Sequence, residues 1–268
     1  MSLRTALKAL PTMLRIGFSE AVAYRAEMII WVLATTMPLI MLALWSAVAR
    51  GGPVGRFGQA EFTGYFLAAF CVRQMTSSWV AWLVSYEVKQ GTLAMRLLRP
   101  ISPLLSYATE VLAGIPLRVA IVLPVLGISL WAAGTEHAVP TSLGGWGLFA
   151  LGIVGAWLIT FYLNVLLGTL SLFLESSQKL MEVYMVLFFV CSGYMFPVEF
   201  FPPGVRTVME WLPFRYQMGL PVELMTGAHA TKEAWALLAA QWTWVLGLGV
   251  VSMAVWRRGL ARFAAFGG

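Results

Sequence analysis

Six long apolar runs, separated by charged or turn-forming residues, dominate the chain. They cover residues 28–49, 62–85, 104–132, 145–174, 180–197 and 234–256. A helix needs about 20 apolar residues to cross the hydrocarbon core of a bilayer. Because each run approaches or exceeds that length, the pattern predicts an all-α membrane protein with six transmembrane helices. We expect these helices to form a single domain over residues 1–268.

The first 25 residues have a different, amphipathic pattern. Apolar residues recur at steps of three and four: Leu3, Leu7, Leu10, Leu14, Phe18 and Ala21. The opposite face is polar and basic: Arg4, Lys8, Thr12, Arg15 and Ser19. This periodicity predicts a helix over residues 1–25 that lies in the membrane interface, with its basic side toward anionic headgroups. A cleaved signal peptide is the alternative, although Lys8, Pro11 and Arg15 interrupt the apolar core that a signal peptide needs.

The composition agrees with a location in lipid. Of the 268 residues, 60% are hydrophobic and 11% are charged, and the mean hydropathy is +0.80. A soluble domain carries about 25% charged residues. A soluble protein of this size could not bury so much apolar surface, and six spans with short connections leave no room for a separate soluble domain.

The sequence also lacks residues that several kinds of enzyme need. All twelve acidic residues are Glu, and there is no G-x-x-x-x-G-K-[ST] phosphate loop and no Asp to hold magnesium. We therefore expect this chain not to hydrolyse nucleotide itself. Cys71, Cys191, His137 and His229 stand in separate segments, without the spacing of a metal site or a disulfide framework. Neither H-E-x-x-H nor G-x-S-x-G is present, which argues against an intramembrane enzyme.

The distribution of Lys and Arg predicts the orientation. Six spans place both termini on one side of the membrane, and that side holds eleven basic residues: Arg4, Lys8, Arg15, Arg25, Lys89, Arg96, Arg99, Lys179, Arg257, Arg258 and Arg262. The other side holds five: Arg50, Arg56, Arg206, Arg215 and Lys232. By the positive-inside rule both termini are cytoplasmic. The net charge of +6 then comes from dispersed membrane flanks, so we expect no nucleic acid as a partner.

A charged segment at residues 86–98 follows the second apolar run. Its characteristic residues are Glu87, Lys89, Gly91, Thr92 and Leu93. They form a polar projection longer than a simple turn requires. We predict a short, charged, amphipathic helix on the cytoplasmic surface. A plain connecting loop that carries positive-inside residues is the alternative.

A second unusual segment, at residues 192–216, follows the fifth run on the other side. It is too apolar for a solvated loop, and its prolines exclude one straight helix. We predict a re-entrant pair of short helices that dips into the outer leaflet against protein. The residues that mark this hairpin are Gly193, Phe196, Pro197, Pro202 and Pro203.

Charged residues lie inside two of the predicted spans. Arg73 is near the middle of the second span, and Glu110 and Arg118 lie in the third. An Arg at the centre of a span costs about 2.5–3.5 kcal/mol on insertion scales, so such residues normally face protein or water. They either line a translocation path or have a structural role, as an ion pair or in bonds to backbone carbonyls. Glu110 and Arg118 are about 12 Å apart along a helix and are not expected to be direct partners.

The order of these motifs resembles the type-2 ABC exporter permeases. That family has a Glu-x-x-x-Gly-Thr-Leu stretch after the second span, which corresponds to Glu87 to Leu93, followed by the run 97–100. Its Ser-Gly-x-x-Phe-Pro segment after the fifth span corresponds to residues 192–197. The start at residues 20–27 and the ending at 256–260 are similar to the branch of paired permeases that includes drug- and viologen-exporter-like systems.

The resemblance implies a division of labour between subunits. Two permease chains, identical or related siblings, form the path for a hydrophobic or amphipathic compound in the bacterial inner membrane. Two copies of a separate ATPase bind ATP and Mg²⁺, and this permease holds no cofactor of its own. The resemblance implies that the segment 86–98 is the coupling helix that contacts the ATPase. In that contact Glu87 pairs with a basic residue of the ATPase groove, and Gly91 allows close approach of the backbone. The hairpin after the fifth span corresponds to an outer gate. The permease is embedded in membrane lipid.

A stand-alone ion-coupled secondary transporter or channel is the competing function. Such carriers usually place acidic or His residues deep in their spans. Here both histidines fall in loops, and Glu110 is the acidic residue well inside a span. An inverted repeat is not evident either.

Overall fold

The computed structural model describes residues 3–133, 139–174 and 177–266. Within these ranges the backbone forms helices joined by short connections, and no strand forms beyond an isolated bridge between Val54 and Phe57. The prediction of an all-α protein is therefore confirmed.

The helices follow one another with few loops between them. The first half of the chain contains α1 (Leu3–Ala23), α2 (Arg25–Ala34), α3 (Met37–Ala49), α4 (Gln59–Thr76), α5 (Val80–Lys89), α6 (Leu93–Leu97), α7 (Pro103–Ala113) and α8 (Ile115–Ala133). The second half contains α9 (Leu143–Thr169), η1 (Leu170–Leu172), α10 (Ser177–Cys191), η2 (Val198–Phe200), α11 (Pro203–Trp211), α12 (Pro213–Gln217), α13 (Gly219–Met225) and α14 (Thr231–Phe266).

Four helical stretches in the described part of the chain are long and apolar enough to cross a membrane. They are Arg25–Ala49, Pro103–Ile128, Leu143–Leu172 and Thr231–Phe263. Each matches one of the predicted spans, although Thr231–Phe263 exceeds the expected 234–256 at both ends. The chain is thus a multi-pass membrane protein.

The two remaining predicted spans differ from the structure in their boundaries. The run 62–85 is interrupted, because α4 ends at Thr76 and the extended backbone of Ser77 (ψ 139°) separates it from α5. The run 180–197 corresponds to α10, which has 15 residues and ends at Cys191. The first interruption follows the largely polar run 73–78, which the prediction had included in one span, and the second falls at Ser192 and Gly193.

Two further breaks divide spans that composition shows as continuous. The hydroxyls of Thr35 and Thr36 donate to the carbonyl oxygens of Val32 and Leu33, at 2.9 and 2.8 Å, where α2 ends. Such hydroxyl bonds compete with the backbone ladder of a helix. The third span divides into α7 and α8 at Gly114.

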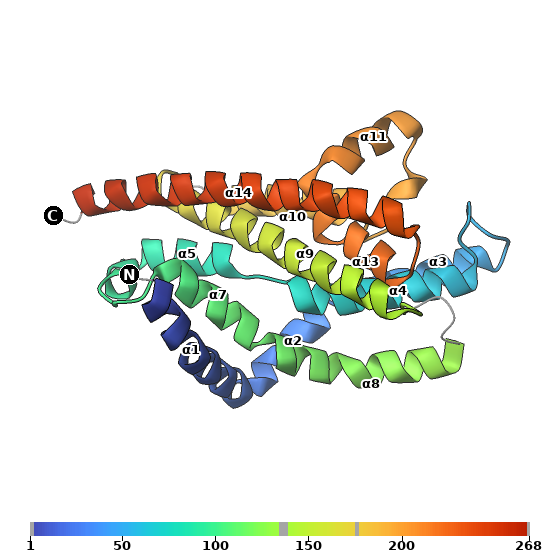
Figure 1. Ribbon diagram of the computed structural model, residues 1–268, viewed down its shortest axis with the longest axis horizontal. Coiled ribbons are helices and arrows are strands. Elements are labelled where there is room, and N and C mark those ends of the chain that lie inside the picture. The colour runs from blue at the N-terminus through green and yellow to red at the C-terminus, as the bar shows by residue number, and fades with distance from the viewer. Residues whose placement is uncertain (1–2, 134–138, 175–176, 267–268) are drawn as a thin grey trace.

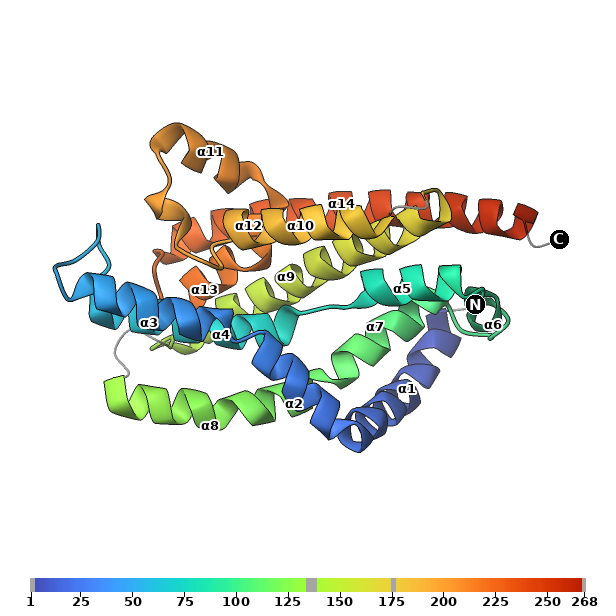
Figure 2. The same ribbon diagram turned by 180° about the vertical axis from the view of Figure 1, so that it is seen from behind.

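The helices pack in an elongated bundle, which Figures 1 and 2 show from opposite sides. The longest pair, α9 and α14, run side by side, and α5 packs on α9. The middle helix α4 contacts both α3 and α8, and α1 lies against α7. The beginning of α1, the short α6 and the end of α14 lie at one end of the long axis, named here the terminal end. The end of α3 and the beginning of α14 lie toward the opposite end.

A close approach fixes α5 against α9. A side-chain carbon at Gly168 would lie 2.8 Å from Cβ of Val84 and 3.1 Å from the backbone of Ala81. Only glycine therefore fits at this crossing, in the manner of small residues at helix interfaces in membranes. The contact holds α5, and with it the segment that follows, in one position relative to the long α9–α14 pair.

Candidate functional site

An ionic network at the terminal end joins α5, α6 and α7. The guanidinium of Arg96 in α6 donates to the carboxylate of Glu87 in α5, with Nη2 at 2.6 Å from Oε1. Its Nη1 donates to Glu110 of α7 at 2.7 Å and to Ser106 at 2.8 Å. The hydroxyl of Tyr107 donates to the same Glu87 carboxylate. One arginine therefore links three helices that are separate in sequence.

The network is largely shielded from solvent. Glu87 is 8% exposed, and the Arg96 guanidinium stacks over the Tyr107 ring, 4.2 Å from its centroid. Burial alone would lower the pKa of Arg96, but its hydrogen bonds to Glu110 and Glu87 raise this pKa above its ordinary value. The arginine stays charged, and the geometry is the bidentate type that gives the strongest carboxylate pairs.

This geometry corrects one expectation about Glu87. The family resemblance placed its carboxylate against a basic residue of the ATPase, whereas the structure pairs it with Arg96 of the same chain. Leu93 is also buried within the chain. Lys89, Gly91 and Thr92 are exposed on the segment, and Gly91 takes a positive φ of 72° that allows the chain to turn. The predicted residues therefore divide into an internal pair and an exposed set of three.

Two exposed apolar residues of this segment were missed by the sequence analysis. Met95 is 67% exposed and Leu98 is 80% exposed, at the terminal end of the molecule. Their spacing of three residues places them on one face of α6 and its C-cap. The spacing of Met95 and Leu98 could have indicated an exposed apolar face. The neighbouring Leu93 and Leu97 are also apolar, however, and they are buried or half-buried, so the sequence does not show which of these residues face outward.

The buried Arg118 makes bonds that fit the structural alternative. It donates to the backbone carbonyls of Val111 (3.0 Å), Gly114 (3.4 Å) and Ser77 (3.4 Å), and also to the Ser77 hydroxyl. These acceptors lie where α7 meets α8 and where α4 ends. Glu110 pairs with Arg96 and not with Arg118, as the spacing along the helix predicted.

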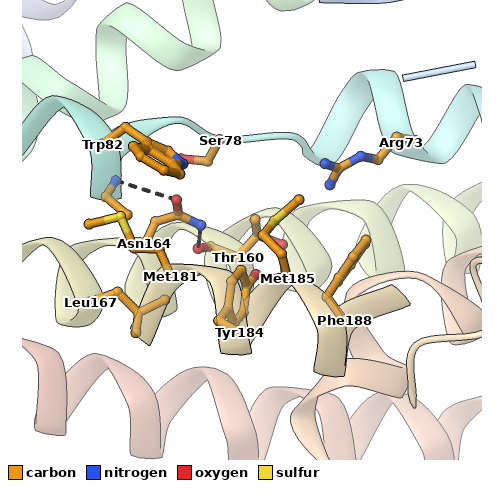
Figure 3. A pocket seen from close by; sticks show the side chains of 11 residues that line it. Arg73, Ser78, Trp82, Thr160, Asn164, Leu167, Met181, Tyr184, Met185 and Phe188 are labelled. Atoms are coloured by element: carbon orange, nitrogen blue, oxygen red, sulfur yellow. Dashed lines mark hydrogen bonds between the residues drawn. The ribbon is translucent and has the colours of Figure 1, made fainter. Parts of the chain in front are cut away.

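Arg73 has a different environment. It is 8% exposed, and its guanidinium lies 4.9 Å from the ring centroid of Phe188 and 5.7 Å from that of Tyr194. The buried Nε atom has no hydrogen-bond partner. Among the described residues Arg73 forms no ion pair. Its side chain reaches a small cavity between α4, α5, α9 and α10, shown in Figure 3.

The predicted hairpin after α10 is a compact series of short helices. Gly193 has a φ of +86°, and its carbonyl accepts a hydrogen bond of 2.7 Å from the Tyr65 hydroxyl. Pro197 is buried and precedes η2. Pro202 and Pro203 are exposed at the beginning of α11, where a proline needs no backbone donor. The segment contains η2, α11 and α12 and so has more pieces than the expected helix pair.

Aromatic packing holds this hairpin against the rest of the bundle. The rings of Phe196 and Phe201 pack in a tilted arrangement, with centroids 5.2 Å apart and planes inclined at 59°. Phe200 contacts Phe57, Phe62 and Trp45, at centroid distances of 5.5, 6.0 and 5.1 Å. Phe200 therefore joins the hairpin to α3 and α4, whereas Phe196 packs within the hairpin itself.

A second ionic cluster lies beside the hairpin and was not found from the sequence. Glu223 of α13 accepts from Arg215 at 3.0 Å, and its carboxylate is 2.7 Å from Nε2 of His229. The other His229 nitrogen, Nδ1, is 3.0 Å from Glu233. Burial alone would raise the pKa of Glu223, but the hydrogen bond from His229 and the charge of Arg215 lower it to about 2. The hydrogen bond to Glu223 raises the pKa of His229 above 6.5.

This cluster predicts a pH-dependent stability. Because the pKa of His229 is raised on folding, its contribution is complete below pH 6.5 and is lost as the pH rises through the raised value. We expect the unfolding temperature of the purified protein to fall as the pH rises above 6.5 and through the raised pKa of His229. His229→Gln should flatten that part of the profile. An unchanged pH profile in His229→Gln would contradict the assignment, and Lys232→Gln is a control at an exposed position.

Comparison with known proteins places the chain in a family. A search of the curated proteins gives no match. A family model described as ABC-2 family transporter protein matches residues 57–267, well over half of the chain. The matched range includes the ionic network at the terminal end, the cavity at Arg73 and the hairpin after α10. The chain therefore belongs to the ABC-2 family of transporter proteins.

Proposed function

We propose that this chain is the membrane-spanning subunit of an ATP-driven exporter in the bacterial inner membrane. Two permease chains, identical or related, would form the path, and two ABC ATPase subunits would bind ATP and Mg²⁺ at the cytoplasmic face. The family match supports a membrane permease of this type. The chain has no phosphate loop, so hydrolysis belongs to the partner.

The proposal includes six crossings of the membrane. Four stretches are long enough individually. We assign the other two crossings to the broken pair α4–α5 and to α10 with the residues that follow it. A discontinuous helix is acceptable in a membrane where other protein covers its free backbone groups, and α4 is packed between α3 and α8. With six crossings, the terminal end is cytoplasmic and carries the basic excess.

The observation that carries the coupling proposal is the Glu87–Arg96–Glu110 network. It fixes α6 rigidly to α5 and α7, so that a force applied to α6 moves both helices together. The exposed Met95 and Leu98 would then be the contact with the ATPase. A partner of this kind must bind two permease conformations with different affinities, because otherwise its hydrolysis could not shift the permease.

The hairpin after α10 would close the path on the outer side. Its attachment to α3 and α4 through Phe200 and Tyr65 links it to the same broken span that ends in the coupling segment. Movement at the terminal end could therefore reach the hairpin along α4 and α5.

The test of this function is affinity purification of the tagged chain in mild detergent, followed by mass spectrometry and transport in proteoliposomes. We expect a nucleotide-binding ATPase, with or without a second permease, to co-purify, and transport to require ATP. A chain that purifies alone, and whose transport follows an ion gradient without ATP, would overturn the proposal in favour of a secondary transporter.

A further inference from the structure

A small cavity with both polar and apolar walls lies at the interruption between α4 and α5. Its volume is about 20 Å³, enough for one or two water molecules. Figure 3 shows Arg73 extending toward this space from α4, Asn164 and Thr160 from α9, and Tyr184 from α10. The extended residues at the helix break leave room that a continuous helix would fill.

Among the residues that the structure describes, no carboxylate pairs with the charge of Arg73 in this cavity. Arg96 and Arg215 each pair with carboxylates, and Arg118 has several oxygen acceptors. Arg73 has two aromatic rings beside it and an unpartnered buried Nε. A guanidinium removed from water normally requires an anion or several oxygen acceptors. The site is therefore incomplete, and what it lacks is negative charge.

The other cavity residues fit an organic body attached to that charge. Trp82 lines the cavity and is 41% exposed, so this wall reaches the surface of the chain. Met181 and Met185 supply flexible apolar surface, which adapts to ligands of different shape. The Asn164 amide is engaged with Thr160 and with the Ala81 backbone, and it holds the polar side of the cavity in place.

We propose that this cavity binds the anionic group, a carboxylate or phosphate, of an amphipathic organic anion, with Arg73 as the charged binding residue. The apolar part of the ligand rests against Trp82 and Met185 at the mouth. An amphipathic cation is excluded because no carboxylate lines the cavity and Arg73 would repel it. That this anion is the transported compound rests on the proposed exporter function, whereas the binding site itself does not.

The test uses three naphthalene probes that differ in charge: 2-naphthoate, the neutral 2-naphthamide and 2-naphthylmethylammonium. Their binding to the full chain is measured by calorimetry in zwitterionic phosphatidylcholine nanodiscs, with empty discs subtracted. We expect naphthoate to bind about tenfold more tightly than the amide, and the cation more weakly than the amide. Arg73→Gln should abolish the preference, and Arg73→Lys should retain part of it. Arg50→Gln, at an exposed position at the end of α3, should leave it unchanged.

Three other outcomes would contradict either the anion site or the transport of the bound anion. Equal binding of the three probes, or a preference that survives in Arg73→Gln, would overturn the anion site. Both Arg73 variants must elute as folded protein in size-exclusion chromatography, and Arg73→Lys keeps the charge if Arg73→Gln misfolds. Loss of naphthoate binding in discs that contain phosphatidylglycerol would assign the site to a lipid headgroup and overturn a transported anion. The purification experiment above tests the exporter function separately, because probe binding requires no ATPase.

Discussion

Replacement of Arg96 by alanine is expected to lower the free energy of unfolding by about 3 kcal/mol and to abolish ATP-driven transport. The substitution leaves the Glu87 carboxylate, which is 8% exposed, with the Tyr107 hydroxyl as its remaining described partner. It also frees Glu110, which lies close to the same guanidinium. The loss of one partner of a buried ion pair costs far more than the pair contributes when intact. Unfolding by dodecyl sulfate in mixed micelles measures the first effect, and proteoliposome transport measures the second.

Two variants control this prediction. Arg99→Ala removes an exposed arginine from the same segment and should change the unfolding free energy by less than about 0.5 kcal/mol. Arg96→Lys keeps the charge without the bidentate fork and should give an intermediate stability. If Arg96→Ala unfolds at the same denaturant concentration as Arg99→Ala, the network does not hold the segment.

The same network changes the expected outcome of a charge reversal at Glu87. If Glu87 faced a partner protein, Glu87→Arg would reduce transport and leave assembly intact. In the structure that variant places a second guanidinium against Arg96 and beside the buried Tyr107 hydroxyl. Reduced assembly is therefore the expected result, so this variant does not test the contact with the ATPase.

The double substitution Met95→Glu and Leu98→Glu is expected to remove the ATPase from the purified complex without unfolding the chain. Both side chains are mostly exposed, so the new carboxylates cost the isolated permease little. At a docking surface, two desolvated carboxylates would weaken binding by several kcal/mol, enough to reduce the recovered ATPase at least about tenfold. Quantitative mass spectrometry of the tagged complex measures the ratio of ATPase to permease.

A matched substitution on another helix controls for the added charge. Val208 of α11 is 57% exposed and belongs to the hairpin, away from α6. Val208→Glu should leave the ratio of ATPase to permease unchanged. Full recovery of the ATPase with the double variant would exclude α6 as the contact and would favour the exposed Lys89, Gly91 and Thr92 or the helix α1.

Local sequence patterns determined the class of this protein. Apolar runs with about one charged residue in nine require a helical membrane protein, because a lipid environment leaves a backbone no other way to satisfy its hydrogen bonds outside a closed barrel. Four of the six runs correspond to stretches that are long enough to span. The charged segment 86–98 and the proline-rich segment after α10 were also located, since both interrupt the apolar pattern.

The partners of the charged residues were decided by tertiary structure alone. Arg96 and Glu87 are nine residues apart and lie on different helices, and Glu223 reaches both Arg215 and His229 across turns. No periodicity predicts such pairs, because they depend on how separate helices pack. The interruption between α4 and α5 follows the largely polar run 73–78, and there Arg118 of α8 donates to the Ser77 carbonyl, a contact that only the packing of separate helices creates. Hydrophobicity therefore determined the four stretches that are long enough to span a membrane, because their composition alone suits lipid. The packing of separate helices decided which charges pair, and within the described ranges it leaves Arg73 without a carboxylate partner.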